Sequence, residues 1–147
     1  MKIIVTLDNN NGMMFNKRRQ SQDIVIRNDI KNLTKKSILY MNEFSYKLYK
    51  DIDCGNIKVS NDFLNRCQDN DFCLVESEKL ISYIDKIDTI IVYKWNREYP
   101  SDFKFDINLK DEKWTLIKKQ EFKGNSHDKI TKEIYRRKYS EEKIQRN

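Results

Sequence analysis

The hydrophobic positions of the chain fall into short apolar runs that are separated by polar stretches. Two runs, residues 2–7 (KIIVTL) and 89–95 (TIIVYKW), are rich in β-branched or aromatic residues and predict buried strands. Three shorter runs predict further strands at 37–41, 56–60 and 72–75. Near the end of the chain, residues 114–122 and 131–139 lie on either side of a Gly-Asn turn and predict an antiparallel hairpin.

The spacing of apolar residues also predicts helices. Ile26, Ile30 and Leu33 recur at helical intervals, and Ser21 or Asp23 is placed to cap a helix that ends near residue 34. Shorter helices are expected at 44–49, 61–70 and 77–88. Strands and helices alternate first and strands dominate later. This order predicts an α/β fold with a mixed, mostly parallel central sheet, flanking helices and a C-terminal antiparallel hairpin.

Length and composition limit the class of protein. The 147 residues fit a single domain, 1–147, in which residues 139–147 are expected to form a frayed tail. A content of 12% aromatic residues argues against a disordered chain. No apolar run reaches the roughly 18 residues of a membrane helix, and the first residues lack the cleavage region of a signal peptide. We therefore expect a cytoplasmic protein without a membrane partner.

The cysteines and the histidine argue against a metal site. Cys54, Cys67 and Cys73 are odd in number and contain no CxxC pair, so we expect ordinary thiols rather than a disulfide framework or a zinc site. The single histidine, His127, excludes a site built from several histidine ligands. No bound metal is expected.

Several strings, in their order along the chain, resemble the dihydrofolate reductase family. IIVTLDNNNGMM and DIKNLT resemble its first strand, loop and helix, MNEFSY resembles MGRKTY, and NIKVS resembles NIVLT. FCLVESEKLISYIDKIDTIIVYKW, SDFKF and the closing hairpin follow in the family's order, after a shorter middle. The resemblance implies that residues 12–23 form a mobile loop over a substrate cleft, where Met13, Met14 and Phe15 contact a ligand. The alternative is that these three side chains pack at the edge of the core.

The family's chemical groups are missing at the positions that the resemblance implies. Ile26 stands where a carboxylate holds the pterin, and Asp23 takes that place only if the helix is offset by about one turn. Glu76 and Ser77 replace the Gly-Gly turn that approaches the dinucleotide phosphates, and Glu43 replaces the basic residue of MGRKTY. We therefore expect no dihydrofolate reduction and no cofactor, NADPH included.

The resemblance also brings three polar segments, NKRRQSQD, YKWNREYP and GNSHDKIT, together around the cleft. Arg18, Arg19 and Arg97 can form charge-assisted hydrogen bonds to an anion, and Trp95 can stack on a base. A net charge of +6 favours such anionic partners. The alternative is that Trp95 belongs to the core and that the arginines form surface salt bridges. The candidate ligand-binding residues are Asn16, Arg18, Arg19, Gln20, Ser21, Asn42, Trp95, Asn96 and Arg97.

Asp23 and His127 are weaker candidates for catalysis. His127 has a side chain that can transfer a proton near neutral pH, but the alternative is an exposed histidine of the hairpin. A triad of Ser126, His127 and Asp128 is disfavoured, because adjacent residues rarely converge as nucleophile, base and orienting group. The strings GMMFNKRRQSQD, WNREYP and GNSHDKIT are also similar to short proteins labelled ribonuclease Z, although enzymes of that name need a histidine-rich site for two metal ions.

Three functions follow from these residues. The first, which they favour, is a non-reductase protein that binds a nucleotide, RNA or another anionic ligand in a modified cleft. The second is a diverged enzyme, a reductase or a ribonuclease, that uses Asp23 or His127. The third is a protein-interaction module, in which Met13, Met14 and Phe15 dock on another protein or in a homodimer.

Overall fold

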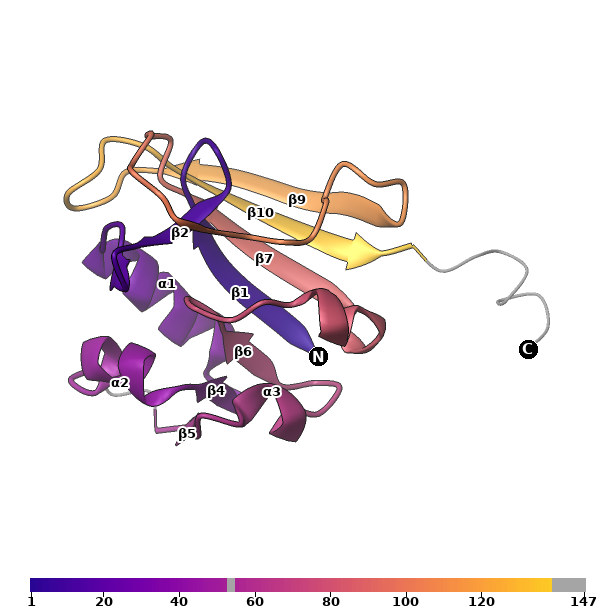
Figure 1. Ribbon diagram of the computed structural model, residues 1–147. Coiled ribbons are helices and arrows are strands. Elements are labelled where there is room, and N and C mark those ends of the chain that lie inside the picture. Colours follow the sequence, from indigo (N-terminus) through magenta and orange to yellow (C-terminus); the bar gives the residue numbers. More distant parts are fainter. Residues whose placement is uncertain (53–54, 139–147) are drawn as a thin grey trace.

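The computed structural model describes residues 1–52 and 55–138 (Figure 1). A seven-stranded sheet is parallel through its first five strands and ends in two antiparallel ones. The predicted mixed, mostly parallel α/β fold with a closing antiparallel hairpin is therefore confirmed. The predicted tail at 139–147, the last hairpin residue and Cys54 lie outside the described residues. In sheet order the strands are β5 (Ile57–Val59), β4 (Leu39–Met41), β6 (Phe72–Leu74), β1 (Lys2–Leu7), β7 (Thr89–Lys94), β10 (Ile130–Arg137) and β9 (Trp114–Phe122).

The two faces of this sheet carry separate hydrophobic clusters. Ile3 and Val5 of β1 belong to one cluster, whereas Ile4 between them belongs to the other. The second cluster also contains Ile26 and Ile30 of the helix α1 (Ile24–Thr34), which lies beside the parallel strands in Figure 1. Because both faces are covered, the central strands are apolar at successive positions instead of alternating with polar residues.

The predicted helices that have both an apolar face and a capping side chain are confirmed. Asp23 caps α1 and Asn42 caps α2 (Glu43–Tyr49), each through a side-chain oxygen that accepts a backbone N–H. The prediction at 61–70 is wrong in extent, because α3 covers only Phe63–Arg66. The prediction at 77–88 is wrong in type, since Ile81–Lys86 forms a short 3₁₀ helix, η1, with no buried residue that would hold an α-helix against the core.

Residues 12–23 do not form the expected loop. Strands β2 (Gly12–Phe15), β3 (Arg18–Arg19) and β8 (Phe103–Lys104) make a small antiparallel sheet. Met13 and Met14 are each only 5% exposed and pack in the first core cluster, so the alternative interpretation is confirmed for both. Their burial argues against docking on a partner, whereas a ligand contact of Met14, which also lines a groove of about 690 Å³, stays a prediction. Phe15 alone is 39% exposed.

The outer strand β9 carries both apolar and charged side chains. Leu116 and Ile117 of β9 are among the exposed large hydrophobic side chains, and Lys118 and Lys119 follow them directly. Within the described chain, β9 has a strand neighbour on one side only, which is β10.

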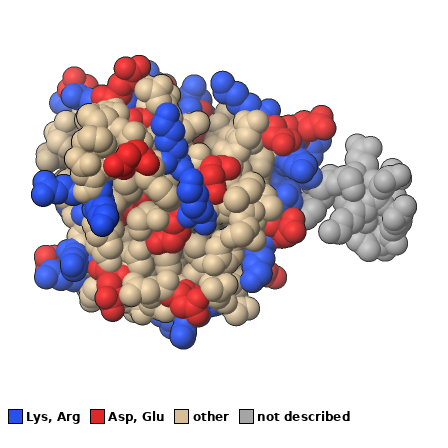
Figure 2. Space-filling model, in the orientation of Figure 1, with Lys and Arg blue, Asp and Glu red and all other residues tan. Residues whose placement is uncertain are grey.

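Figure 2 shows lysines and arginines interspersed with acidic residues over the visible face. No helix in the described part of the chain has the length and apolarity needed to cross a membrane.

The packing of α1 predicts a large effect of truncating Ile30, which is almost fully buried. Ile30→Ala should lower the free energy of unfolding by about 3 kcal/mol, because it removes buried methyl groups and leaves a cavity. The matched control is Ile81→Ala on η1, where the side chain is 56% exposed and the loss should stay below about 0.5 kcal/mol. Urea unfolding measures both; equal losses would contradict the assigned core.

Candidate functional site

The buried Asp23 carboxylate joins the start of α1 to the loop between β9 and β10. Asp23 Oδ1 accepts the backbone N–H of Val25 at 3.0 Å and that of Asn125 at 2.9 Å. Oδ2 accepts the backbone N–H of Ser126 at 2.9 Å and the Ser126 hydroxyl at 3.2 Å. Two elements about a hundred residues apart in sequence therefore share one side chain.

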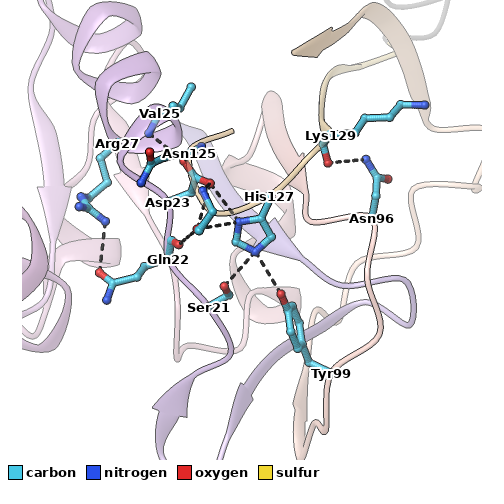
Figure 3. Close-up of polar contacts among 11 residues, drawn as sticks. Ser21, Gln22, Asp23, Val25, Arg27, Asn96, Tyr99, Asn125, His127 and Lys129 are labelled. Carbon is cyan, nitrogen blue, oxygen red and sulfur yellow. Dashed lines mark hydrogen bonds and ion pairs between the residues drawn. The ribbon is translucent and has the colours of Figure 1, made fainter. Parts of the chain in front are cut away.

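His127 continues this network toward two hydroxyl groups (Figure 3). Its Nδ1 lies 3.0 Å from Asp23 Oδ2, and its Nε2 lies 3.0 Å from both Ser21 Oγ and the Tyr99 hydroxyl. The ring stacks on Trp95 with centroids 4.5 Å apart and an interplanar angle of 27°. His127 is only 3% exposed, so the interpretation as an exposed hairpin histidine is wrong.

The charge of the Asp23 carboxylate determines which nitrogen of the His127 ring carries a proton. Burial by itself would raise the pKa of Asp23, but hydrogen bonds from the Asn125 backbone and the His127 side chain outweigh it and lower the pKa well below its usual range. An ionised carboxylate only accepts hydrogen bonds, so the network assigns a proton to His127 Nδ1. In the neutral ring Nε2 then carries a lone pair facing Ser21 and Tyr99.

Gly124 provides the space for this arrangement. A Cβ atom at this position would lie 2.5 Å from Asp23 Oδ2 and 2.9 Å from the backbone oxygen of His127, both closer than real Cβ contacts. The Gly124 N–H also donates to that backbone oxygen at 2.9 Å. The predicted Gly-Asn turn is thus part of a longer loop that folds over the carboxylate.

Four of the predicted ligand-binding residues line one groove of about 460 Å³ beside β3. Arg18 is exposed, and its guanidinium forms no ion pair with any other described residue. Tyr99, whose hydroxyl meets His127, lines the same groove, as does the exposed Phe15. The full lining is Phe15, Asn16, Arg18, Arg19, Gln20, Tyr99 and Pro100. A second groove, of about 690 Å³, shares Asn16 but contains none of the predicted arginines.

Arg19 and Gln20 are largely occupied by the protein itself. Arg19 Nε lies 2.8 Å from Glu76 Oε2 and Nη2 lies 3.0 Å from Oε1, while the guanidinium also covers the Phe44 ring at 4.5 Å. Burial acts to lower the pKa of Arg19, but the hydrogen bond and charge of Glu76 raise it overall. Gln20 Nε2 donates to Asp8 at 2.9 Å. Of the two arginines that line this groove, Arg18 is therefore the one that is open to an anion.

The other predicted ligand-binding residues do not line the groove beside β3. Asn42 caps α2 and also donates to Ser77 and Glu78, and Asn96 donates to the Lys129 carbonyl and the Thr131 hydroxyl. Trp95 is buried, which confirms its alternative assignment to the core. Arg97 is exposed away from the groove lining.

A small cavity lies next to the Asp23 network. Its volume is about 20 Å³, enough for about one water molecule. Ser21, Asp23, Ile26 and Arg27 are among its lining residues. Arg27 Nη1 donates to Gln22 at 3.3 Å, whereas the buried Nε of Arg27 has no hydrogen-bond partner among the described residues. A cationic residue, Arg27, and a carboxylate residue, Glu76, therefore both line a space that takes one oxygen-sized group.

Sequence reasoning named Asp23, His127 and Ser21 separately but missed their contact and missed Tyr99, Arg27 and Gly124. One local signal was the two-residue spacing of Ser21 and Asp23. On an extended segment such side chains point the same way, and Asp23 is extended, with φ −152° and ψ 125°. The contacts of Tyr99 and Gly124 depend on long-range folding and have no such signal.

Neither a metal site nor a known relative identifies the function of this site. Across residues 1–52 and 55–138, no three His, Cys, Asp or Glu side chains are arranged to hold a metal ion. Cys67 and Cys73 have free thiols. The sequence matches no protein-family model and no curated protein.

The Asp23 network predicts a pH-dependent contribution to stability. The Asp23 pKa is lower in the folded chain than the unfolded value of about 4, so the stabilisation is present above about pH 5 and is lost as the pH falls toward the folded pKa. Asp23→Asn should lower the free energy of unfolding by about 2 kcal/mol at pH 7, and this difference should shrink between pH 5 and pH 2. Urea unfolding at each pH measures it.

The matched control is Asp128→Asn, because Asp128 is exposed and adjoins His127 in sequence. Its effect should stay within about 0.5 kcal/mol at every pH. A loss in Asp23→Asn that does not change with pH would contradict an ionised Asp23 in the folded chain.

Proposed function

We propose that the chain is a non-reductase protein that binds a small anionic ligand with an aromatic ring, such as a nucleotide, in the groove beside β3. The observation that carries this proposal is the position of Arg18, exposed and without an ion pair to any described residue, in a groove of about 460 Å³ that also contains the rings of Phe15 and Tyr99. This volume lies in the range of small-molecule sites.

The groove lining supplies both kinds of recognition that a nucleotide needs. A guanidinium forms bidentate, charge-assisted hydrogen bonds to phosphate, and aromatic side chains stack on a base. Asn16 and Gln20, which also line the groove, carry amide groups that match the polar edge of a base.

The proposal keeps a dihydrofolate reductase-like architecture without the reductase chemistry. The mostly parallel sheet with a closing antiparallel hairpin supports the architecture. Ile26 is buried at the wall of a cavity of about 20 Å³, which leaves no space for a pterin ring. Glu76, at the position of the family's phosphate-binding glycines, brings a carboxylate that is already bonded to Arg19 and Ser45. Both observations support the absence of reductase activity.

A protein-interaction function has less support, because Met13 and Met14 are buried and only Phe15 of the three apolar residues is exposed. A diverged enzyme is favoured by one specific observation, the contact of His127 with Asp23 on one side and Ser21 on the other. That contact lies next to the groove in sequence, since Ser21 follows Gln20.

Isothermal titration calorimetry with adenosine and uridine nucleotides tests the proposal. Arg18→Ala should weaken nucleotide binding by about 10-fold or more, because a charge-assisted hydrogen bond to phosphate is lost. The matched control is Arg97→Ala, an exposed arginine outside the groove, which should change the affinity less than about two-fold.

Two results would count against the nucleotide proposal. One is equal weakening by the two alanine variants, which would indicate a diffuse effect of net charge. The other is the absence of heat with any mononucleotide while a short single-stranded RNA binds, which would assign a longer polyanion to the groove.

A further inference from the structure

We propose that Ser21 is a nucleophile activated by His127 and Asp23, and that this site hydrolyses a carboxylic ester. The inference goes beyond ligand binding. Only one part of it rests on the proposed function, namely that the ester carries an anionic group that Arg18 holds in the groove beside β3.

The first support is the order and spacing of the three groups. Asp23 Oδ2 lies 3.0 Å from His127 Nδ1, and His127 Nε2 lies 3.0 Å from Ser21 Oγ. A carboxylate on Nδ1 holds the imidazole in the tautomer that leaves Nε2 free to accept the serine proton. Figure 3 shows the ring between the two partners, with Ser21 and Asp23 both reaching it from the segment before α1.

The second support is that the protein fixes the ring without blocking the serine. Trp95 stacks on His127 at 4.5 Å, and Ser126 Oγ lies 3.1 Å from Nδ1. His127 therefore has little rotational freedom, as a preorganised base requires. Ser21 is only half-buried, in contrast to the buried Asp23 and His127. A reacting carbonyl, and later the hydrolytic water, can approach the half-buried serine from the solvent side while Trp95 and Ser126 hold the base in place.

The third support is a place for the charge that develops on the carbonyl oxygen. The cavity of about 20 Å³ is bordered by Ser21 and by Arg27, whose buried Nε has no hydrogen-bond partner among the described residues. A cationic side chain near the developing oxyanion stabilises the transition state, and the carboxylates of Asp23 and Glu76, which line the same cavity, are paired with His127 and Arg19. The cavity takes one oxygen atom, which fits a carbonyl oxygen better than any larger group.

The reaction proceeds in two balanced steps. In the first, Ser21 Oγ bonds to the carbonyl carbon, its proton passes to His127 Nε2, and the ester C–O bond breaks as the alcohol leaves with that proton. In the second, His127 removes a proton from water, the resulting hydroxide attacks the acyl carbon, and the C–O bond to Ser21 breaks. Ser21 regains a proton from His127, and the carboxylic acid leaves.

Tyr99 gives the mechanism a distinctive consequence. Its hydroxyl also lies 3.0 Å from His127 Nε2, and a neutral ring nitrogen has one lone pair. The two hydroxyl groups therefore compete for one acceptor. Removing the Tyr99 hydroxyl frees Nε2 for Ser21, whereas a serine with a purely structural role would gain no reactivity.

The experiment is covalent labelling of the full chain with a fluorophosphonate, followed by intact mass and peptide mass spectrometry. Ser21 Oγ should bond to phosphorus, the P–F bond should break, and fluoride should leave. Ser21→Ala should abolish this label, and His127→Gln should slow it by about 100-fold or more. Tyr99→Phe should label at least as fast as the unchanged chain. The matched control Ser82→Ala removes an exposed serine of η1 and should leave the rate unchanged.

Circular dichroism shows whether each variant is folded, and Ser21→Ala and Tyr99→Phe remain decisive if His127→Gln unfolds. No label on the unchanged chain, a label on Ser126, or a Tyr99→Phe rate as low as that of Ser21→Ala would each overturn the proposal.

Hydrolysis of two 4-nitrophenyl esters separates this proposal from the proposed function. The neutral acetate ester tests Ser21 alone, and the negatively charged succinate half-ester tests the groove as well. Arg18→Ala should slow only the charged ester, by about 10-fold. If Ser21 is labelled but Arg18→Ala slows neither ester, the nucleophile stands and the anionic substrate is refuted. Nucleotide binding without any labelling of Ser21 would refute the nucleophile and leave the proposed function standing.

Discussion

The set of hydrogen bonds to the Asp23 carboxylate is the interaction on which this region of the protein depends. One buried side chain caps α1, holds two backbone N–H groups of the loop between β9 and β10, and orients His127. A buried carboxylate is costly unless it is saturated with donors, and here the donors come from distant segments. Folding of the loop and ionisation of Asp23 are therefore coupled, and the geometry at Ser21 depends on both.

The parts of the fold that the sequence predicted are those in which local preference and burial agree. The strands at 2–7 and 89–95 are β-branched and covered on both faces, and both were found within one residue of their expected ends. The helix near 61–70 was overestimated in length and the one at 77–88 in type: the first buries only Phe63 and Leu64 in the core, and the fully buried residues of the second, Leu80 and Ile87, lie outside η1 at its two ends. For Met13 and Met14, contact with a ligand and packing at the core edge both stayed open, because nothing local indicated that β8, almost ninety residues later, would pair with β2.

The site was predictable as a set of residues but not as an arrangement. Loop composition identified Arg18, Ser21 and Asp23, and uniqueness drew attention to His127. Their roles depend on which partner each meets: Arg19 meets Glu76, whereas Arg18 meets none among the described residues. Such pairings are set by the packing of segments that are far apart in sequence, so the two adjacent arginines of β3 have different chemistry.

The outer strand β9 also shapes how copies of the chain meet. On the side where β9 has no strand neighbour among the described residues, its peptide groups can pair with a second extended chain, and Leu116 and Ile117 would add apolar contact. Lys118 and Lys119 stand at its middle, so two β9 strands that approach antiparallel bring like charges together. Electrostatic repulsion thus opposes the pairing of two copies through this edge, and it weakens as salt rises.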